Sequence, residues 1–484
     1  MPMSLQEFMK QLIPVYPEFL MVLFALAILV LDFLVERKHK AALGWLALVG
    51  IVIAAVMTAK LEGLSGAFFG RTVLLDPFAL FFKQVFYVSC GLGILISMKY
   101  LDIEEIHRGE YYALMLFATS GMMVMASAGD LITLYLGLEL MALSVYILAG
   151  FMRKDSRSNE AGIKYLLLGA FSSGIMLYGM SLLYGLTGTT NLNDIALFLR
   201  GTDLSNPVLF LSMAMLLVSF GFKVAAVPFH MWVPDVYEGA PTSVTAFMSA
   251  GPKVAGFAVL LRVFLHALDP VRSDSSFLIS LLAVATMAVG NIMAISQTSI
   301  KRMLAYSSIA HAGYALVGLA AGGPDGAASV MLYVLIYAVM NMGAFGVVIM
   351  LRKTGIRGEE IADFAGLGKT NKTAAFLMLI FMFSLTGIPP MAGFVGKFYI
   401  FKSAVQAGLL WLAIVGVLFS AISAYFYLRV IMIMYMYDSK EEISLVQSPA
   451  LALALAVSVT AVLVIGVYPG PVLEFARASV AGLL

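Results

Sequence analysis

The sequence predicts an all-α integral membrane protein with about fourteen transmembrane helices. Of its 484 residues, 61% are hydrophobic and only 12% are charged, and the mean hydropathy is +0.96. Soluble domains have roughly 25% charged and 45–50% apolar residues. Apolar runs of about 20 residues, the length that crosses a bilayer, also recur along the whole chain. The net charge of +2 is too small to indicate a nucleic-acid partner.

The apolar runs place the helices in order along the chain. We expect them near residues 14–34, 41–58, 77–98, 111–128, 131–152, 162–187, 207–238, 242–266, 277–296, 303–322, 327–351, 373–402, 408–437 and 449–469. The loops between them are too short for a separate soluble domain. The N-terminal residues MPMSLQEFMKQLIP lack the basic region and cleavage site of a signal peptide, so the first helix is expected to stay in the membrane.

Basic residues in the loops predict the orientation, because cytoplasmic loops carry an excess of lysine and arginine. One set of alternate loops holds seventeen: Arg37, Lys38, Lys40, Lys99, Arg108, Arg153, Lys154, Arg157, Lys164, Lys301, Arg302, Arg352, Lys353, Arg357, Lys369, Lys372 and Lys440. The opposite set holds seven: Lys10, Lys60, Arg71, Arg200, Arg272, Lys402 and Arg477. This asymmetry predicts that both termini lie outside the cytoplasm. An even number of helices, which puts both termini on the same side of the membrane, agrees with this prediction.

Two of the expected helices are too long for one straight crossing. Residues 207–238 would extend about 46 Å as a helix, whereas the apolar core of a bilayer is about 30 Å thick. Each long segment contains proline, in AVP at 226–228 and in GIPP at 387–390. Because proline lacks an amide donor and clashes with the preceding turn, we expect both helices to be broken.

The two expected breaks, about 160 residues apart, indicate a duplicated architecture. Interrupted helices in corresponding positions are typical of transporter folds built from structural repeats. We therefore expect three N-terminal helices in 1–110, one five-helix repeat in 111–266, a second in 267–437 and a C-terminal helix in 438–484. An odd number of helices per repeat makes the two copies inverted.

Four ionisable residues fall at the depth of the bilayer core. They are Glu139, in the middle of its helix, Lys223, before the first break, Lys253, after Pro252, and Lys397, after the second break. Such a side chain costs at least ~2.5–3.5 kcal/mol at the membrane centre, so it points to a function. Burial lowers the pKa of a lysine and a nearby carboxylate raises it, so a series of these groups is suited to passing protons. The alternatives are a packed carboxylic acid for Glu139 and lysines that extend to the membrane surface.

Four further residues are weaker candidates for the same relay. His230 and His311 have the side chain that titrates nearest neutral pH, but each is as well explained as a hydrogen-bonded core histidine. Lys164 follows Glu160 by four residues, which is the spacing of a simple ion pair on a helix. Tyr306 is as well explained by packing as by ordering a water molecule.

The sequence offers no catalytic or cofactor motif. No P-loop, GxGxxG, HExxH or paired CxxC pattern occurs, and Cys90 is the single cysteine. One cysteine can form neither an intrachain disulfide nor a cysteine cage for an iron–sulfur cluster. We therefore expect no redox or hydrolytic chemistry from this chain alone, and no bound cofactor or metal.

Four motifs carry a resemblance that extends over essentially the whole chain. LGLELMALSVYILAG, KVAAVPFHMWVPDVYEGAPTSVTAFMSAGPKVAGF, KRMLAYSSIAHAGY and SLTGIPPMAGFVGKF resemble the subunit N family of bacterial NADH–quinone oxidoreductase (complex I), related to subunits of Mrp-type cation/proton antiporters. The resemblance implies fourteen helices, two inverted five-helix repeats and proton translocation at mid-membrane. It also implies that Glu139 and Lys223 match the family's key pair, Lys253 the connecting lysine and Lys397 the lysine of a second channel. Lysine at 397, and the end of the chain after helix fourteen, favour subunit N over its antiporter-like relatives.

The same resemblance implies a role within a larger assembly. It predicts a subunit of the NADH:quinone oxidoreductase translocase in the bacterial plasma (inner) membrane, with periplasmic termini and other membrane-arm subunits, including antiporter-like ones, as partners. NADH, FMN, iron–sulfur clusters and a quinone would then belong to other subunits. The alternatives are a subunit of an Mrp-type antiporter or of a membrane-bound hydrogenase, and a scaffold that only spaces other pumping subunits.

Overall fold

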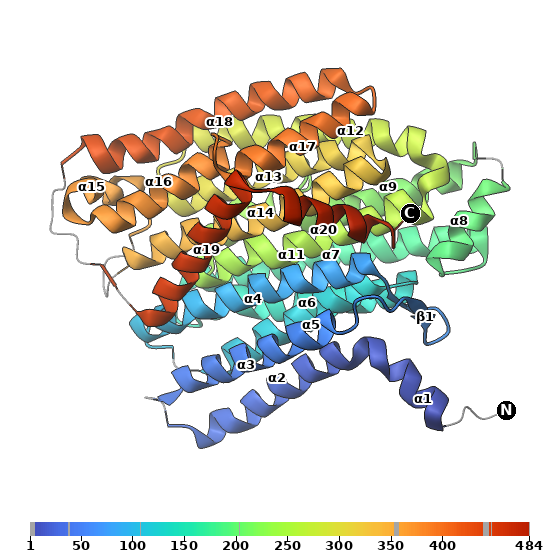
Figure 1. Ribbon diagram of the computed structural model, residues 1–484, viewed down its shortest axis with the longest axis horizontal. Coiled ribbons are helices and arrows are strands. Elements are labelled where there is room, and N and C mark those ends of the chain that lie inside the picture. The colour runs from blue at the N-terminus through green and yellow to red at the C-terminus, as the bar shows by residue number, and fades with distance from the viewer. Residues whose placement is uncertain are drawn as a thin grey trace.

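The computed structural model describes residues 5–36, 39–106, 108–202, 204–352, 358–438, 445–446 and 448–483. Long helices run side by side in one direction, and the connections gather at two opposite ends (Figure 1). Five of the basic residues used to predict the orientation lie outside the described residues: Arg37, Lys38, Lys353, Arg357 and Lys440.

The helices follow the expected order from the N-terminus. The first part comprises α1 (Leu5–Leu12), η1 (Ile13–Val15), α2 (Tyr16–Leu34), α3 (Ala41–Ala59), β1 (Gly66–Phe68), β2 (Val73–Leu75) and α4 (Pro77–Ile103). The next comprises α5 (Glu110–Ser127), α6 (Leu131–Ala149), α7 (Ser156–Thr187), α8 (Leu192–Arg200), α9 (Pro207–Val224), α10 (Trp232–Gly239), α11 (Thr242–Arg262), η3 (Val263–Ala267) and η4 (Asp269–Val271). The antiparallel β1–β2 pair and the short helix α8 were not expected from the sequence.

The second half continues the pattern. It comprises α12 (Arg272–Ile295), α13 (Ile300–Ala321), α14 (Gly323–Met350), η5 (Ile361–Phe364), α15 (Leu367–Thr370), α16 (Lys372–Thr386), α17 (Ala392–Gln406), α18 (Leu410–Met436), α19 (Pro449–Val467) and α20 (Gly470–Val480). In the described part of the chain, 12 helices are long and apolar enough to cross a membrane. Helices also cover the two remaining expected segments, as α5 and as the pair α16–α17. The all-α membrane fold is therefore confirmed, while the count of fourteen crossings and the inverted repeats stay predictions.

Both expected helix breaks are present. The first separates α9 from α10 at residues 225–231, and the second separates α16 from α17 at residues 387–391. Ala225 ends α9 with a φ of 66°, and Gly387 ends α16 with a φ of 90°. Such left-handed residues commonly terminate helices, so each chain segment turns out of its helix before the proline is reached.

The last expected crossing, at 449–469, is present as α19, and a further short helix that the sequence did not predict, α20, follows it. A Cβ atom built on Gly466 would lie 2.0 Å from the carbonyl oxygen of Pro390. The end of α19 thus packs against the second helix break, and only a glycine permits this approach. α20 then continues along α4, where the rings of Phe475 and Phe81 lie 5.2 Å apart. The predicted end of the crossing near Tyr468-Pro469-Gly470 is correct, but the sequence did not reveal the short helix α20 beyond it.

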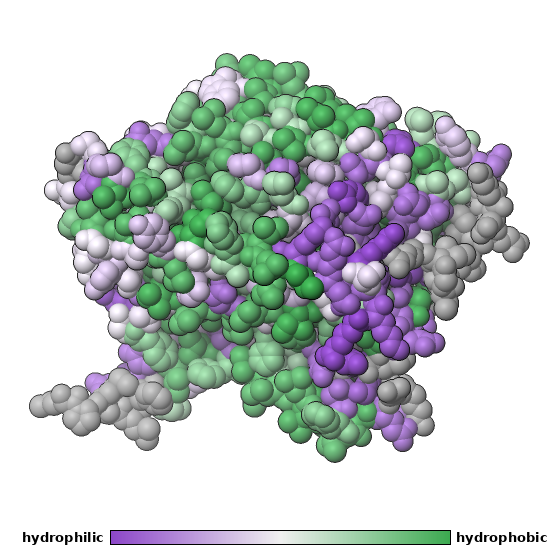
Figure 2. All heavy atoms as spheres, turned by 180° about the vertical axis from the view of Figure 1, so that it is seen from behind, coloured by the Kyte–Doolittle hydropathy of each residue, from purple (hydrophilic) through white to green (hydrophobic). Residues whose placement is uncertain are grey.

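The two ends of the bundle differ in composition. We call the end that holds the β1–β2 pair, α8 and both chain termini the hairpin end, and the opposite end, where Lys301, Arg302 and Arg352 lie, the basic end (Figure 1). Seen from behind, hydrophobic residues cover much of the surface, and hydrophilic residues gather toward the basic end (Figure 2). Outward-facing apolar residues are the pattern expected of a surface in contact with lipid or with neighbouring subunits.

Two helices form the buried centre of the bundle. All residues of α11 are buried, and all residues of α13 except Arg302 are buried. α11 packs on α14 and α4, and α13 packs on α12, α14 and α17. Polar side chains on α11 and α13 are therefore shielded from lipid by other helices.

Candidate proton-relay site

Lys223 lies buried in the last turn of α9, directly before the first break. Its Nζ donates a hydrogen bond to Tyr146 Oη at 3.2 Å and lies 5.6 Å from the centres of the Tyr146 and Phe222 rings. The carbonyl of Phe222 accepts a hydrogen bond from Trp232 Nε1 at 3.0 Å. The ammonium of Lys223 thus has one hydrogen-bond partner among the described residues, and its surroundings are mainly aromatic.

Glu139 lies half-buried in the middle of α6. One of its carboxylate oxygens accepts a hydrogen bond from Ser173 on α7. In the part of the chain that the structure describes, neither a hydrogen bond nor an ion pair joins it to Lys223. Tyr146 follows Glu139 by seven residues, on the same face of α6. A Cβ atom on Gly169 of α7 would lie 1.9 Å from Tyr146 Oη, so this glycine makes room for the hydroxyl that binds Lys223.

Lys253 lies buried at the middle of α11. Its Nζ donates a hydrogen bond to the carbonyl of Ser308 at 2.6 Å, contacts the hydroxyl of the same residue, and lies 5.9 Å from the centre of the Tyr337 ring. Three residues further along α11, a Cβ atom on Gly256 would lie 3.7 Å from Lys223 Cβ. The two lysines are therefore carried on closely packed helices, although no hydrogen bond joins their side chains within the described residues.

His311 lies on α13, one turn beyond Ser308, and is buried. Its Nδ1 lies 2.6 Å from Tyr333 Oη and its Nε2 lies 3.1 Å from Tyr427 Oη. The Tyr427 hydroxyl also contacts Ser307. A cavity of about 10 Å³ lies between Lys253, His311 and Tyr333, and its lining includes Val254, Phe257 and Val334.

Lys397 lies on α17, just after the second break, and its ammonium is held by three oxygens. Its Nζ donates to the carbonyls of Leu385 and Thr386, at 3.1 and 2.8 Å, and to Ser420 Oγ at 2.9 Å. It also lies 4.7 Å from the centre of the Tyr314 ring. The two carbonyls belong to the last turn of α16, where a helix leaves carbonyl groups without an internal partner. Lys397 therefore caps the helix that the break interrupts.

Lys397 also borders a groove on the outer surface of the bundle. The groove has a volume of about 880 Å³ and is lined mainly by apolar residues of α17 and α18. It extends from Gly387 at the break to Lys402 and Gln406 near the hairpin end. Lys397, although buried, thus lies at the edge of an apolar groove that opens on the exterior of the bundle.

Unlike His311, the other three weaker candidates lie apart from these contacts. Lys164 is paired with Glu160 at 2.7 Å and with Asp235 at 2.8 Å, at the basic end, which is the ion-pair alternative considered from the sequence. His230 lies in the segment between α9 and α10, and its buried Nδ1 has no hydrogen-bond partner. Tyr306 is buried on α13 and forms no side-chain hydrogen bond within the described residues. None of the three contacts Lys223, Lys253 or Lys397 through a hydrogen bond in that part of the chain.

Two further buried cations, to which the sequence assigned no role, prove to be paired. Lys83 on α4 forms an ion pair of 2.7 Å with Glu18 on α2. Arg262 on α11 forms hydrogen bonds of 2.8 and 3.1 Å with Asp76, the residue that caps α4. Both pairs join helices that are distant in sequence, so each cation has a structural partner and neither needs a place in the relay.

Sequence analysis missed the hydroxyl groups that contact the ionisable residues. These are Tyr146, Ser173, Ser308, Tyr427 and Ser420. Helical spacing could have indicated the first, which shares a face with Glu139. The serines gave no signal, because serine is common in membrane helices and its partner is decided by the packing of separate segments.

The arrangement of these side chains is suited to moving protons. Buried amines, an imidazole, a carboxylate and hydroxyls follow one another across α6, α7, α9, α11, α13 and α17. Each can accept or donate a proton without breaking a carbon bond. Among the described residues, no group of three or more His, Cys, Asp or Glu side chains is placed to hold a metal ion.

Comparison with known proteins identifies the sequence family. Residues 128–423 match the family model described as NADH:quinone oxidoreductase/Mrp antiporter, TM. NADH-quinone oxidoreductase subunit N of Trichlorobacter lovleyi is 51% identical over 468 residues, which are 96% of each chain. Subunit N 2 of the same enzyme in Rhizobium meliloti is 48% identical and covers 96% of this chain and 97% of its own.

Solved structures share the fold. A chain of respiratory complex I from Thermus thermophilus, with bound aureothin, superimposes with a TM-score of 0.80 at 31% identity, covering 96% of this chain and 100% of its own. A chain of the Mrp complex from Dietzia has a TM-score of 0.81 at 21% identity, covering 98% of this chain and 97% of its own. At this lower identity the second likeness shows the fold alone.

Proposed function

The chain belongs to the subunit N family of NADH–quinone oxidoreductase, and from this premise we propose that it translocates protons in the membrane arm of that enzyme. Electron transfer from NADH to quinone would take place in other subunits, which would hold FMN, the iron–sulfur clusters and the quinone. The chain itself would contribute no redox step. Its setting would be the bacterial plasma membrane, with the basic end in the cytoplasm and both termini in the periplasm.

The observation that carries this proposal is the series of buried ionisable groups with hydroxyl partners. Glu139 bonds Ser173, Lys223 bonds Tyr146 and Lys253 bonds Ser308, all inside the helical bundle. Each ionisable side chain in the membrane interior lowers the stability of the bundle, and apolar side chains could fill the same space without that cost. A scaffold that only spaces other pumping subunits gives no reason to retain them.

We assign the residues distinct roles in this transfer. Glu139 and Lys223 form a pair in which the charge of each favours the charge of the other, so a proton arriving at one releases a proton from the other. Lys253 and His311 pass the proton through the bundle centre, and Lys397 serves the second channel. His230, Tyr306 and Lys164 are assigned no transfer step.

The test is to replace Lys223 by alanine in the assembled complex. We expect proton uptake into inverted membrane vesicles during NADH oxidation to be largely lost, while native gels show an intact complex. Lys223→Arg should also pump poorly, because arginine keeps its proton throughout the working pH range. Parental uptake by an intact Lys223→Ala complex would contradict the relay role and leave the scaffold alternative.

An Mrp-type antiporter subunit is the second candidate function, since the family model includes it. The relatives at 48–51% identity are oxidoreductase subunits, whereas the likeness to the Mrp complex extends only to the fold. The subunits that copurify in mild detergent separate the two. Recovery of quinone-site and NADH-oxidising subunits supports the oxidoreductase, and recovery of Mrp subunits alone would favour the antiporter.

A further inference from the structure

One face of α7 leads from the basic end of the bundle to the candidate relay. Ala161, near the start of α7, lines a water-accessible cavity of about 270 Å³. Tyr165 follows it by four residues, and Gly169, which makes room for the Tyr146 hydroxyl, follows by eight. Residues four apart on a helix lie on the same face, one turn above the other. Tyr165 is therefore placed between the cavity and the hydroxyl that binds Lys223.

The helix α10 reaches the same point from the opposite wall of the cavity. Asp235 and Glu238 of α10 line the cavity, and Asp235 pairs with Lys164 of α7 at 2.8 Å. Trp232, the first residue of α10, lies one turn deeper than Asp235. Trp232 and Tyr165 are not among the described residues that line the cavity. Each of them lies one helical turn behind a residue that does.

The rings of Tyr165 and Trp232 stack face to face at this depth. Their centres are 4.2 Å apart, and the angle between their planes is 8°. Both side chains are almost completely buried. Aromatic rings at this distance are in van der Waals contact, so no water molecule fits between them. Water in the cavity cannot pass between α7 and α10 while the two rings are stacked.

On its inner side the stack contacts the surroundings of Lys223. Trp232 Nε1 donates a hydrogen bond of 3.0 Å to the carbonyl of Phe222, the residue before Lys223. The Tyr165 ring lies 4.7 Å from the ring of Tyr146, edge to face. Tyr146 Oη in turn accepts the hydrogen bond of 3.2 Å from Lys223 Nζ. The two stacked rings thus lie between the cavity and the Tyr146–Lys223 pair.

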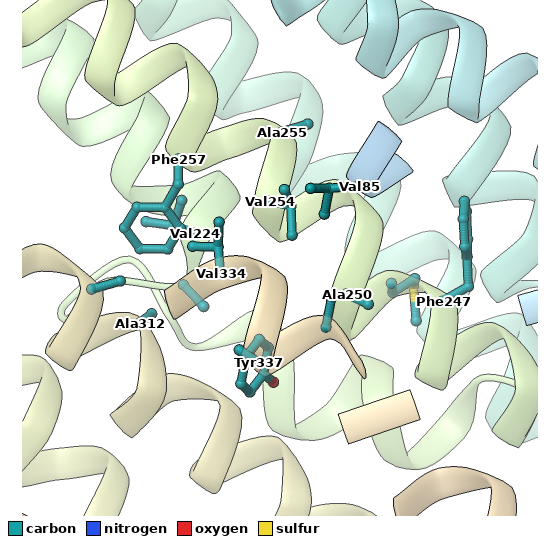
Figure 3. Close-up of a cluster of buried hydrophobic side chains, with 14 of the residues drawn as sticks. Val85, Val224, Phe247, Ala250, Val254, Ala255, Phe257, Ala312, Val334 and Tyr337 are labelled. Atoms are coloured by element: carbon teal, nitrogen blue, oxygen red, sulfur yellow. The ribbon is translucent and has the colours of Figure 1, made fainter. Parts of the chain in front are cut away.

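Apolar packing closes the opposite side of the same turn of α9. Val224, the residue after Lys223, lies among apolar side chains of α11 that include Val254 and Phe257 (Figure 3). A Cβ atom on Gly256 of α11 would lie 2.7 Å from Val224 Cγ1, so the two helices are in close contact there. Water from the basic end would therefore reach Lys223 past the aromatic stack and not through this contact.

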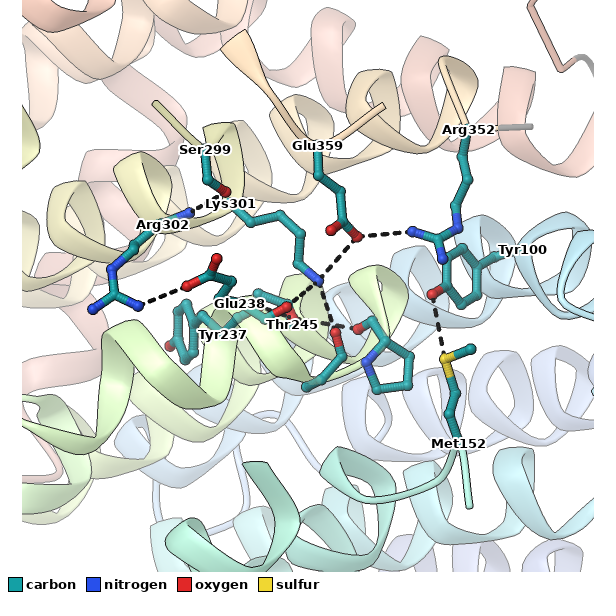
Figure 4. A network of polar contacts seen from close by, with 12 residues as sticks. Tyr100, Met152, Tyr237, Glu238, Thr245, Ser299, Lys301, Arg302, Arg352 and Glu359 are labelled. Carbon is teal, nitrogen blue, oxygen red and sulfur yellow. Dashed lines mark hydrogen bonds and ion pairs between the residues drawn. The ribbon is translucent and has the colours of Figure 1, made fainter. Parts of the chain in front are cut away.

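The two ends of α10 are held differently. At the basic end, Lys301 Nζ donates to the carbonyls of Glu238 and Ala240, both at 2.8 Å (Figure 4). At the inner end, Trp232 directly follows the break at residues 225–231, so no preceding helical turn holds its backbone. Within the described residues, its indole makes a single hydrogen bond, the one to the α9 carbonyl. A rotation of this one side chain, at the cost of that bond and the ring contacts, would open the stack.

We propose that Tyr165 and Trp232 form an aromatic gate between the basic-end cavity and Lys223. The proposal rests on the proposed function and deepens it, because it concerns access to the relay. While the rings are stacked, Lys223 exchanges protons only with groups inside the bundle. When the indole turns away, a proton passes from water to the neutral amine of Lys223, with an O–H bond broken and an N–H bond formed. Restacking of the rings prevents the return of that proton to the basic end, and neither ring carries the proton itself.

The test measures whether position 223 can be reached from the basic end. The buried Cys90 is replaced by alanine and Lys223 by cysteine, and the assembled complex is kept in inverted vesicles, whose outer face is the cytoplasmic one. Aminoethyl methanethiosulfonate, a small water-soluble thiol reagent, is added outside. Tyr165→Ala removes one ring of the stack and should speed labelling of the chain by about tenfold or more, because thiol reactions depend on access. Tyr165→Phe keeps the ring and should label as slowly as the parent.

A matched control removes a buried ring elsewhere. Phe81 is fully buried on α4 near the hairpin end, where its ring lies 5.2 Å from that of Phe475. Phe81→Ala should leave labelling slow. Trp232→Leu can neither stack nor donate a hydrogen bond, so it should speed labelling as Tyr165→Ala does. Slow labelling in an assembled Tyr165→Ala complex overturns the proposal, and if that variant fails to assemble, slow labelling in Trp232→Leu does so.

Proton uptake separates the gate from the proposed function. With Lys223 in place, Tyr165→Ala should still oxidise NADH but take up fewer protons per NADH, because protons return to the basic end, and Tyr165→Phe should restore the parental ratio. If Lys223→Ala fails to pump while Tyr165→Ala changes neither labelling nor this ratio, only the gate is wrong. If Lys223→Ala pumps at the parental rate, the proposed function is wrong, and the gate with it.

Discussion

The two broken helices hold their lysines in different ways. At the first break, Lys223 precedes the interruption and bonds one hydroxyl, that of Tyr146. The carbonyl next to it, of Phe222, is occupied by the indole of Trp232 instead. The first lysine therefore takes no part in closing its own helix.

At the second break the lysine follows the interruption and closes the helix before it. Lys397 donates to Leu385 and Thr386, the last carbonyls of α16, and to Ser420. The same residue type thus serves mainly as a proton carrier at one break and as both carrier and helix cap at the other. A lysine within the membrane can therefore be a proton carrier, a helix cap or both, and the number of oxygens that accept hydrogen bonds from its ammonium group helps to distinguish these roles.

The largest expected effect is a difference in stability between the two alanine variants. Lys397→Ala leaves the Leu385 carbonyl without a donor among the described residues and the Thr386 carbonyl with only the 3.4 Å hydrogen bond from Ser420 Oγ, and hydrogen bonds to charged groups contribute about 1.5–3 kcal/mol each. Lys223→Ala loses one hydrogen bond and removes a buried charge, so it should cost far less. Heating the detergent-solubilised complex and following retention of the chain on native gels measures the difference. Equal losses would mean that Lys397 does not cap α16.

The next largest effect, on proton uptake, should come from filling the space that Gly169 leaves for the Tyr146 hydroxyl. Gly169→Ala places a methyl group 1.9 Å from the present position of Tyr146 Oη, so the hydroxyl must move away from Lys223. We expect proton uptake to fall about tenfold, since one displaced hydrogen bond of about 1.4 kcal/mol corresponds to that factor. Gly174→Ala, on the same helix with nothing within 4 Å, is the control and should pump normally. Similar proton-uptake rates in both variants would show that the position of the Tyr146 hydroxyl does not affect proton transfer.

A smaller effect, on stability, is expected from replacing Gly387 at the second break. Gly387 has a φ of 90°, and a Cβ atom there would lie 3.0 Å from Lys397 Cδ. Gly387→Ala should lower stability by about 1–2 kcal/mol for the backbone conformation, with an added cost for the contact. Gly408→Ala, at a φ of 80° with nothing within 4 Å, pays the backbone cost alone. If thermal unfolding shows no greater loss for Gly387→Ala, the contact with Lys397 is not tight.

The smallest effect on proton uptake should come from removing one of the three hydrogen-bond partners of Lys397. Ser420→Ala leaves Lys397 with the carbonyls of Leu385 and Thr386, so uptake should fall less than twofold. Tyr146→Phe removes the hydrogen-bond partner of Lys223 and should slow uptake more. Measuring both in inverted vesicles ranks the two sites. A greater loss of proton uptake in Ser420→Ala than in Tyr146→Phe would mean that Lys397, and not Lys223, depends more on a single hydroxyl partner.

Much of the fold could be predicted because hydropathy and proline act locally. The ranges of the long helices and both breaks are confirmed, and the residues that announced them were apolar runs, Pro228 and the Pro389–Pro390 pair. The β1–β2 pair, α8 and α20 were missed. These elements depend on contacts between distant segments, such as the bidentate pair of Arg71 with Asp194, at 3.0 and 2.6 Å.

The candidate site divides in the same way. By itself the sequence predicted that Glu139, Lys223, Lys253 and Lys397 belong to helices of the membrane bundle, because each lies within an apolar run, and the structure has them on α6, α9, α11 and α17. Only the tertiary structure decided their partners: Ser173, Tyr146, Ser308 and, for Lys397, the carbonyls of α16 with Ser420. The physical reason is that a hydrogen bond requires two groups within about 3 Å, and the packing of whole helices sets that distance.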